Sequence, residues 1–257
     1  MSVVALTLLG LGVADAVRTR RWRNPQRART LGVLGGLGVL LLFALLAGVT
    51  AVADLGLLVI AAAIIVGWTL TAGESVVRLR GARLPLGVLA AGFTVLLLGS
   101  GWASPAGGLL QRWLVWSGLP ATETALDADR VLLLTGLLLA QLATGNVIVR
   151  LVLIGVGAIR DPGSPQPSDR LRGGRLLGPM ERLVILGLGL AGQVTAASLV
   201  IAAKGLIRFP ELQHSRHDDS VNLEDSLQVY EVTEYFLVGS FVSWLVALAA
   251  LAAAHLV

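Results

Sequence analysis

The stretch LGVLGGLGVLLLFALLAGVTAVADLGLLVIAAAIIVGWTLTAG, residues 31–73, carries a single charged side chain, Asp54. The apolar runs on either side of Asp54 approach or exceed the ~20 residues that an α-helix needs to cross a bilayer. Composition agrees, because 55% of the 257 residues are hydrophobic, only 14% are charged and the mean hydropathy is +0.80. A soluble domain has about 25% charged residues. We therefore expect an all-α polytopic transmembrane helix bundle that forms one integral membrane domain over residues 1–257.

Apolar runs of this kind recur along the chain and predict about seven spans. Four belong to an N-terminal part, residues 1–104, and three to a C-terminal part, residues 130–257. Residues 105–129 between them place Trp113 and Trp116 on the apolar side of a short helix, which is typical of the outer headgroup boundary. The predicted spans are Val3–Val17, Leu31–Ala53, Leu55–Gly73, Leu86–Trp102, Val131–Ile159, Met180–Ala203 and Tyr235–Ala254.

Charged loops predict the topology. Two arginine groups lie between spans one and two and between spans three and four, and such loops are enriched on the cytoplasmic side. The acid-rich loop Phe209–Tyr230 is then outside, the N-terminus outside and the C-terminus cytoplasmic. Because the Arg-, Ala- and Gly-rich composition is typical of a GC-rich bacterial genome, the predicted location is the bacterial cytoplasmic (inner) membrane, as a multi-pass protein. The arginine groups are Arg18, Arg20, Arg21, Arg23, Arg27 and Arg29, and Arg78, Arg80 and Arg83.

The same arginines predict the partners. The formal net charge is +4, but no aromatic platform accompanies the basic runs, so nucleic acid is not an expected partner. Beside membrane segments, arginines are expected to contact anionic lipid headgroups. A homo-oligomer or a membrane partner protein stays open. The chain has no cysteine, which excludes disulfides and thiol chemistry, and no cofactor or metal is predicted.

Three motifs favour a structural interpretation over a chemical one. Gly187-Leu-Gly189-Leu-Ala-Gly192 matches a dinucleotide fingerprint, but it lies in an apolar run and not in a strand–turn–helix unit. We expect its glycines, like Gly32 and Gly36, to pack helices closely. His214 and His217 could ligate a metal, although a solvated loop is the favoured interpretation.

Polar side chains inside the last apolar runs are costly in hydrocarbon, so they are expected to face a partner, a cavity or a pathway. Arg182, Gln193 and Lys204 are spaced by eleven residues, about three helical turns, and would form one stripe on a continuous helix Met180–Ala203. The predicted polar cluster of spans five to seven comprises Asn146, Arg150, Glu181, Arg182, Gln193, Lys204, Arg208, Glu234 and Ser243.

Depth in the bilayer predicts two opposite-charge contacts within this cluster. Arg150 is expected to pair with Glu181 near the cytoplasm. Lys204 or Arg208 is expected to pair with Glu234 near the outside, because a charge near hydrocarbon requires a partner of opposite sign.

The motifs Gly178-Pro-Met-Glu181-Arg182, Lys204-Gly-Leu-Ile-Arg208-Phe209 and Glu234-Tyr235-x-x-x-Gly239-Ser240-x-x-Ser243 follow one another, with Asn146-x-x-x-Arg150 before them. In order and spacing they resemble an uncharacterised family of bacterial polytopic membrane proteins, over about residues 140–245. This chain has Gly205 and Ser240 where that family tends to have Ser and Thr. The resemblance supports the choice of polar residues and implies no reaction.

Two interpretations of the polar cluster stay open. The side chains are either structural pins that fix helix register, or the lining of a site or path for an ion, a proton, a lipid headgroup or a small solute. No nucleophile–base pair or metal cage is recognisable, so we expect a non-enzymatic membrane component: a small transporter, channel-like subunit, sensor or scaffold. The alternative is an intramembrane enzyme that acts on a phosphate-bearing lipid or isoprenoid substrate, with the phosphate bound by the arginines.

Overall fold

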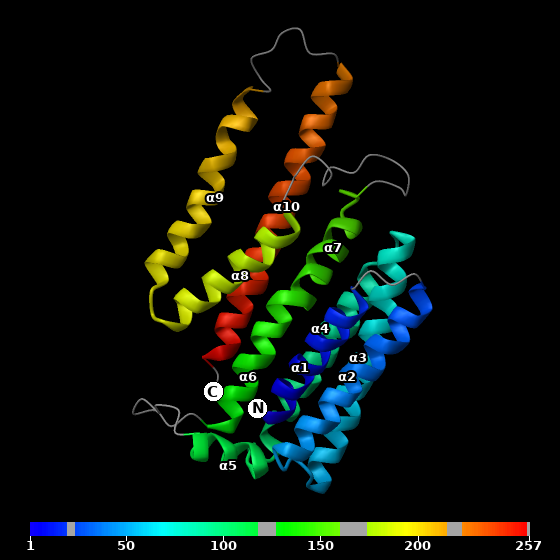
Figure 1. Ribbon diagram of the computed structural model, residues 1–257. Helices are drawn as coiled ribbons and strands as arrows, with labels where there is room; N and C mark the ends of the chain where they lie inside the picture. The colour runs from blue at the N-terminus through cyan, green and yellow to red at the C-terminus, as the bar shows by residue number, and fades with distance from the viewer. Residues whose placement is uncertain (20–23, 118–126, 160–173, 215–222, 256–257) are drawn as a thin grey trace.

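The computed structural model describes residues 1–19, 24–117, 127–159, 174–214 and 223–255, with backbone only at 174–176, 205–214 and 223–233. These residues form helices and no strand (Figure 1). Five helical segments are long and apolar enough to cross a membrane. The prediction of an all-α protein with several helices of membrane-spanning length is therefore confirmed. In chain order the helices are α1 (Ser2–Arg18), α2 (Pro25–Leu46), α3 (Val52–Arg78), α4 (Arg83–Gly99), η1 (Ser100–Trp102), α5 (Gly108–Ser117), α6 (Ala128–Leu139), η2 (Ala140–Thr144), α7 (Gly145–Gly155), α8 (Gly174–Leu190), α9 (Val194–His214) and α10 (Leu223–Ala254).

Helix α1 packs against α2, α3 and α6 and is buried along most of its length. Glycines permit this close packing. A Cβ on Gly36 would lie 2.8 Å from the Gly10 carbonyl oxygen, and one on Gly32 would lie 2.9 Å from the Ala14 oxygen. The packing role predicted for Gly32 and Gly36 is therefore confirmed, because only glycine lets the backbones of α1 and α2 approach this closely.

Buried carboxylates hold the segment that follows α4, at the end of the bundle where α5 lies (Figure 1). Asp54 accepts hydrogen bonds from the backbone N–H groups of Ala51 (2.9 Å) and Ser104 (2.8 Å). Asp129 accepts one from Ala106 N–H (2.9 Å). The short helix expected in this segment is α5, and both of its tryptophans are exposed.

The expected sixth span, Met180–Ala203, is wrong, because the chain folds back within it as a helical hairpin of α8 and α9 (Figure 1). Gly192 adopts φ +73° between the two helices. The N–H of Gln193 donates to the Leu188 carbonyl (2.8 Å), and that of Gly192 donates to the Gly189 carbonyl (3.0 Å). This pair of bonds is the Schellman arrangement that ends a helix at a left-handed glycine. Gly192 therefore ends helix α8 and is not the packing residue that the sequence pattern predicted.

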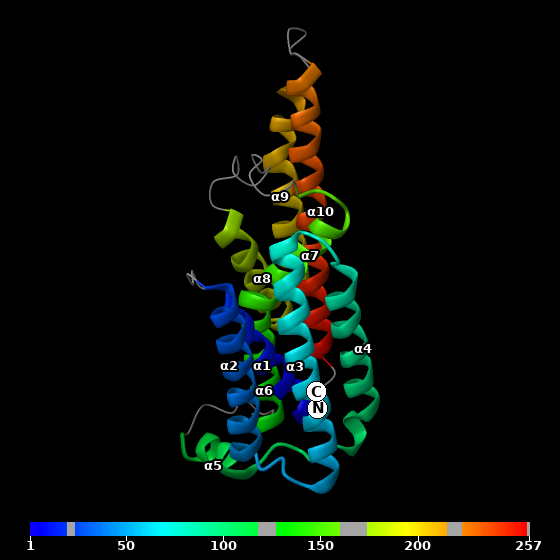
Figure 2. The same ribbon diagram turned by 90° about the vertical axis from the view of Figure 1, so that its right-hand side faces the viewer.

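The hairpin also changes the predicted topology. Helix α10 runs antiparallel to the helix α6–η2–α7, because Gly239 lies beside Leu153 while Gln141 donates to the Val246 carbonyl (3.3 Å). The end of α10 consequently lies at the same end of the bundle as the start of α1 (Figures 1 and 2). The structure thus differs from the predicted placement of the termini at opposite ends, because α9 runs back along α8. The end of α9 and the start of α10, expected on the opposite side, lie towards the end where α3 meets α4 (Figures 1 and 2).

Candidate functional site

The side chain of Arg182 lies inside the C-terminal half and is 1% exposed. Its guanidinium donates to three protein oxygens, one each on η2, α7 and α10. Nε and Nη2 donate to the Gln141 carbonyl (3.1 and 2.8 Å), Nη2 to Asn146 Oδ1 (2.6 Å) and Nη1 to Ser243 Oγ (2.9 Å). The guanidinium thus connects α8 to both the α6–η2–α7 helix and α10. We call Arg182, Asn146, Ser243 and the Gln141 carbonyl the Arg182 cluster.

The Gln141 carbonyl belongs to the π-helical turn η2. A π turn widens the backbone hydrogen-bond spacing from four residues to five, and such turns are frequent at functional sites. Gly145, directly after η2, provides the space beside it. A Cβ there would lie 2.9 Å from Arg182 Nε and 3.1 Å from Arg182 Cζ. The π turn and Gly145 therefore allow the guanidinium to reach the backbone of the neighbouring helix.

The three oxygens that accept hydrogen bonds from Arg182 are all neutral, so dipoles of the protein contribute to stabilising its charge. The preceding carboxylate, Glu181, forms its ion pair with Lys204 on the other arm of the hairpin. Lys204 Nζ also lies 5.4 Å from the ring centroid of Phe236 in α10, a cation–π distance. The Glu181–Lys204 pair therefore joins α8 to α9 beside α10.

Because of the hairpin, other residues of the predicted polar cluster have neighbours that differ from the expected ones. Glu181 pairs with Lys204, where Arg150 was the expected partner. Lys204 lies beside Glu181, because α9 runs back along α8. Gln193 is not on a stripe with Arg182, since it is an exposed residue of the α8–α9 turn. Arg150 and Glu234 are exposed, and the side chain of Arg208 lies outside the described residues.

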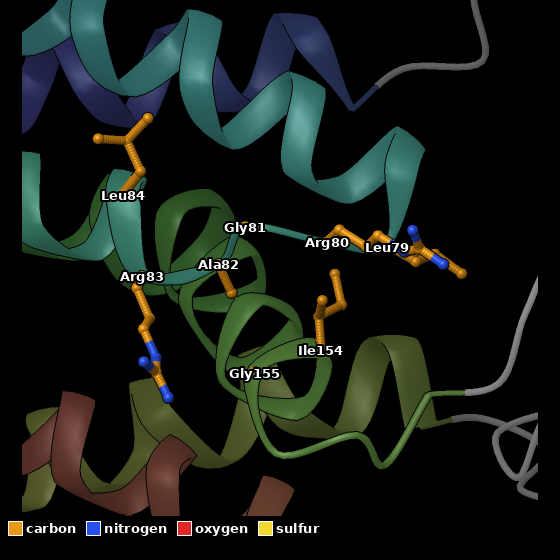
Figure 3. A pocket seen from close by; sticks show the side chains of 8 residues that line it. All are labelled: Leu79, Arg80, Gly81, Ala82, Arg83, Leu84, Ile154 and Gly155. Atoms are coloured by element: carbon orange, nitrogen blue, oxygen red, sulfur yellow. The ribbon is translucent and has the colours of Figure 1, made fainter.

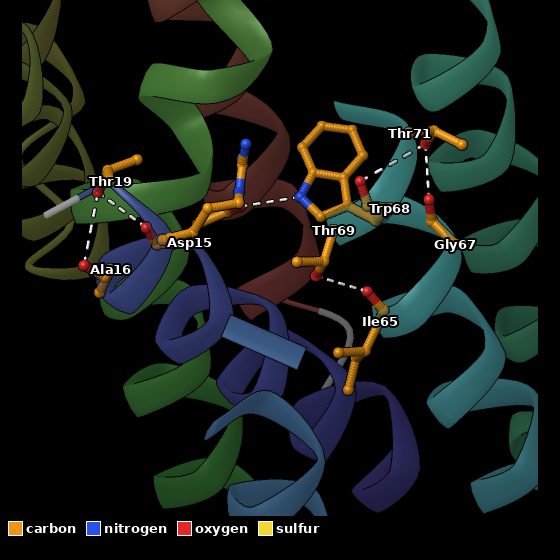
Figure 4. Close-up of polar contacts among 9 residues, drawn as sticks. Asp15, Ala16, Thr19, Ile65, Gly67, Trp68, Thr69 and Thr71 are labelled. Carbon is orange, nitrogen blue, oxygen red and sulfur yellow. Dashed lines mark hydrogen bonds and ion pairs between the residues drawn. The ribbon is translucent and has the colours of Figure 1, made fainter. Parts of the chain in front are cut away.

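A second buried polar group, in the N-terminal half, was missed by the sequence analysis. Asp15 is fully buried and accepts from Trp68 Nε1 (2.9 Å) and from Arg18 Nη2 (2.7 Å). Figure 4 shows Asp15 on α1 facing Trp68 on α3. The available indication was the position of Asp15 inside the first apolar run, where a carboxylate requires a partner.

A shallow cavity of about 430 Å³ lies between the α3–α4 turn and the end of α7. Arg80 and Arg83 line it together with apolar side chains such as Leu79 and Ile154. Figure 3 shows the two arginine side chains extending in different directions, so their charges do not converge on one point.

In the part of the chain that the structure describes, no group of three or more His, Cys, Asp or Glu side chains could hold a metal ion. His217, half of the motif considered for metal binding, lies outside the described residues. Comparison with protein-family models, with curated proteins and with solved structures finds none that matches this chain.

Proposed function

We propose that this protein is a non-enzymatic component of the bacterial cytoplasmic membrane, a sensor or scaffold, whose working element is the α8–α9 hairpin. The observation that carries the proposal is the bonding of Arg182: its guanidinium is buried and donates to protein oxygens through all three nitrogens. A guanidinium already occupied in this way has little capacity left for a substrate phosphate or a transported anion. This favours the interpretation of the Arg182 cluster as pins over that of a site or a path.

The shape of the C-terminal half supports a role in contacting other molecules. Helices α9 and α10 extend past the other helices at one end of the bundle (Figures 1 and 2). The end of α1, the start of α2 and the turn from α3 to α4 belong to the same end, and they carry the described arginines of the two groups, such as Arg18, Arg29 and Arg83, so the positive-inside rule favours the cytoplasm for this extension. A membrane partner protein or a second copy of the chain is the proposed binder there.

The resemblance over about residues 140–245 remains part of the proposal. The residues that carry it include Asn146, Glu181, Arg182 and Lys204, all of which take part in the contacts that fix the hairpin. This supports the choice of residues without adding an activity.

Exchanging the charges of Glu181 and Lys204 tests the proposal. Each side chain of this pair is about one-fifth exposed, so its removal should cost little stability, about 0–1 kcal/mol. We expect Lys204→Met and Glu181→Lys to keep normal membrane abundance but to complement a deletion strain less well than the wild type, since the contact between the hairpin arms is weakened. The double variant Glu181→Lys/Lys204→Glu should restore complementation because it restores the ion pair.

Two results would contradict the proposal. Single variants that complement like the wild type would show that the joined hairpin is not needed. Turnover of a phosphate-bearing lipid by the purified wild-type protein would favour the enzyme alternative instead.

A further inference from the structure

Two arginines from different helices converge on Gly73 of α3. A Cβ on Gly73 would lie 3.2 Å from Nε of Arg29 in α2 and 3.4 Å from Nη1 of Arg18 in α1. Both side chains therefore reach the same point of α3, and the missing side chain of Gly73 leaves the room that they use. We call these two residues the Arg18/Arg29 pair.

The Arg18/Arg29 pair carries more positive charge than its protein surroundings neutralise. Arg18 is paired with Asp15, whose second oxygen accepts from Trp68. Among the residues that the structure describes, Arg29 has no acidic partner. The Nε atoms of both arginines are buried and have no hydrogen-bond partner there. An unpaired donor on a cation is costly when buried, so the pair lacks an acceptor of negative charge.

We propose that the Arg18/Arg29 pair binds a phosphate group, with Arg29 as the main ligand and Arg18 held in place by Asp15. The guanidinium fork matches phosphate oxygens in geometry and charge, and two forks at one point would contact several oxygens at once. The side chain of Arg18 is only 8% exposed, whereas Arg29 is partly exposed and can receive an anion. The phosphate is carried either by the headgroup of an anionic phospholipid or by a soluble phosphate. Arg80 and Arg83 carry no such proposal, because their side chains diverge.

Native mass spectrometry of the purified full-length protein, titrated with phosphatidylglycerol and with phosphatidylcholine, tests this site. We expect the wild type to prefer phosphatidylglycerol, and Arg29→Gln to weaken its binding about tenfold, equivalent to ~1.4 kcal/mol. Arg27→Gln is the matched control, because Arg27 lies on the same helix and is exposed. It should retain the wild-type affinity to within about twofold, since a surface charge contributes little.

Gly73→Ala provides a second variant that keeps both charges. Its Cβ would sit in the tight contact range of both arginine side chains and should weaken the same binding. Competition by inorganic phosphate would assign the site to a soluble phosphate, whereas Arg29-dependent lipid binding without competition would assign it to the headgroup. The proposal is overturned if the wild type shows neither a lipid preference nor phosphate binding, or if Arg27→Gln and Arg29→Gln weaken binding equally.

Discussion

The guanidinium of Arg182 is buried among neutral acceptors, so each acceptor should contribute measurably to stability. Ser243→Ala removes the hydroxyl that accepts from Nη1. We expect the free energy of unfolding in detergent to fall by ~1.5–3 kcal/mol, the range for hydrogen bonds to charged groups. Ser198→Ala is the control, because that exposed hydroxyl donates only to the Val194 carbonyl of its own helix. Equal unfolding free energies for the two variants would show that Ser243 is not a significant acceptor.

Side chains of this cluster could be predicted from the sequence, whereas its backbone could not. Arg182, Asn146 and Ser243 stand out because polar groups in apolar runs require partners. The acceptor that receives two of the guanidinium bonds is the main-chain oxygen of Gln141 in a π turn. Neither residue types nor hydropathy predict a π turn or the direction in which a main-chain carbonyl points. Gly145 was not identifiable either, because the chain holds 31 glycines and only the position of Arg182 distinguishes this one.

The α8–α9 hairpin depends on the left-handed conformation of Gly192. Gly192→Ala adds a Cβ that meets no atom within 4 Å, so steric contact with other residues is not involved. The cost is conformational, ~1–2 kcal/mol for a left-handed non-glycine residue. We expect this loss of unfolding free energy in detergent-solubilised protein. Gly187→Ala, inside α8 and also without neighbours, should be neutral or stabilising by up to ~1 kcal/mol. A stabilised Gly192→Ala variant would mean that α8 and α9 prefer to be continuous.

The same hairpin explains why the hydropathy pattern misled the sequence analysis. Residues 180–203 have the length and apolar content of one span, and Arg182, Gln193 and Lys204 have a helical spacing. The turn at Gly192 contains no charged residue and no proline, so the hydropathy pattern does not reveal a helix end there. The Schellman glycine followed by the amide of Gln193 was the one local indication of a helix end. Where no such turn occurs, as in α2 and α3, the presence of each helix was predictable, whereas its ends were not: α2 covers Pro25–Leu46 where Leu31–Ala53 was expected, and α3 covers Val52–Arg78 where Leu55–Gly73 was expected.

The arrangement of the whole bundle predicts which chain positions share a side of the membrane, and the absence of cysteine makes this measurable. Single cysteines at Gly174, His214 and Ser117 report the start of α8, the end of α9 and the end of α5. We expect a membrane-impermeant maleimide to label Gly174→Cys and His214→Cys from one side, because the hairpin returns to where it began. Ser117→Cys should be labelled from the other side.

A continuous sixth span would instead expose His214→Cys together with Ser117→Cys, and that pattern would refute the hairpin and restore the seven-span topology. A fourth cysteine at His255 separates the two arrangements independently, since six crossings and a hairpin place it with Ser117→Cys, whereas seven spans place it opposite.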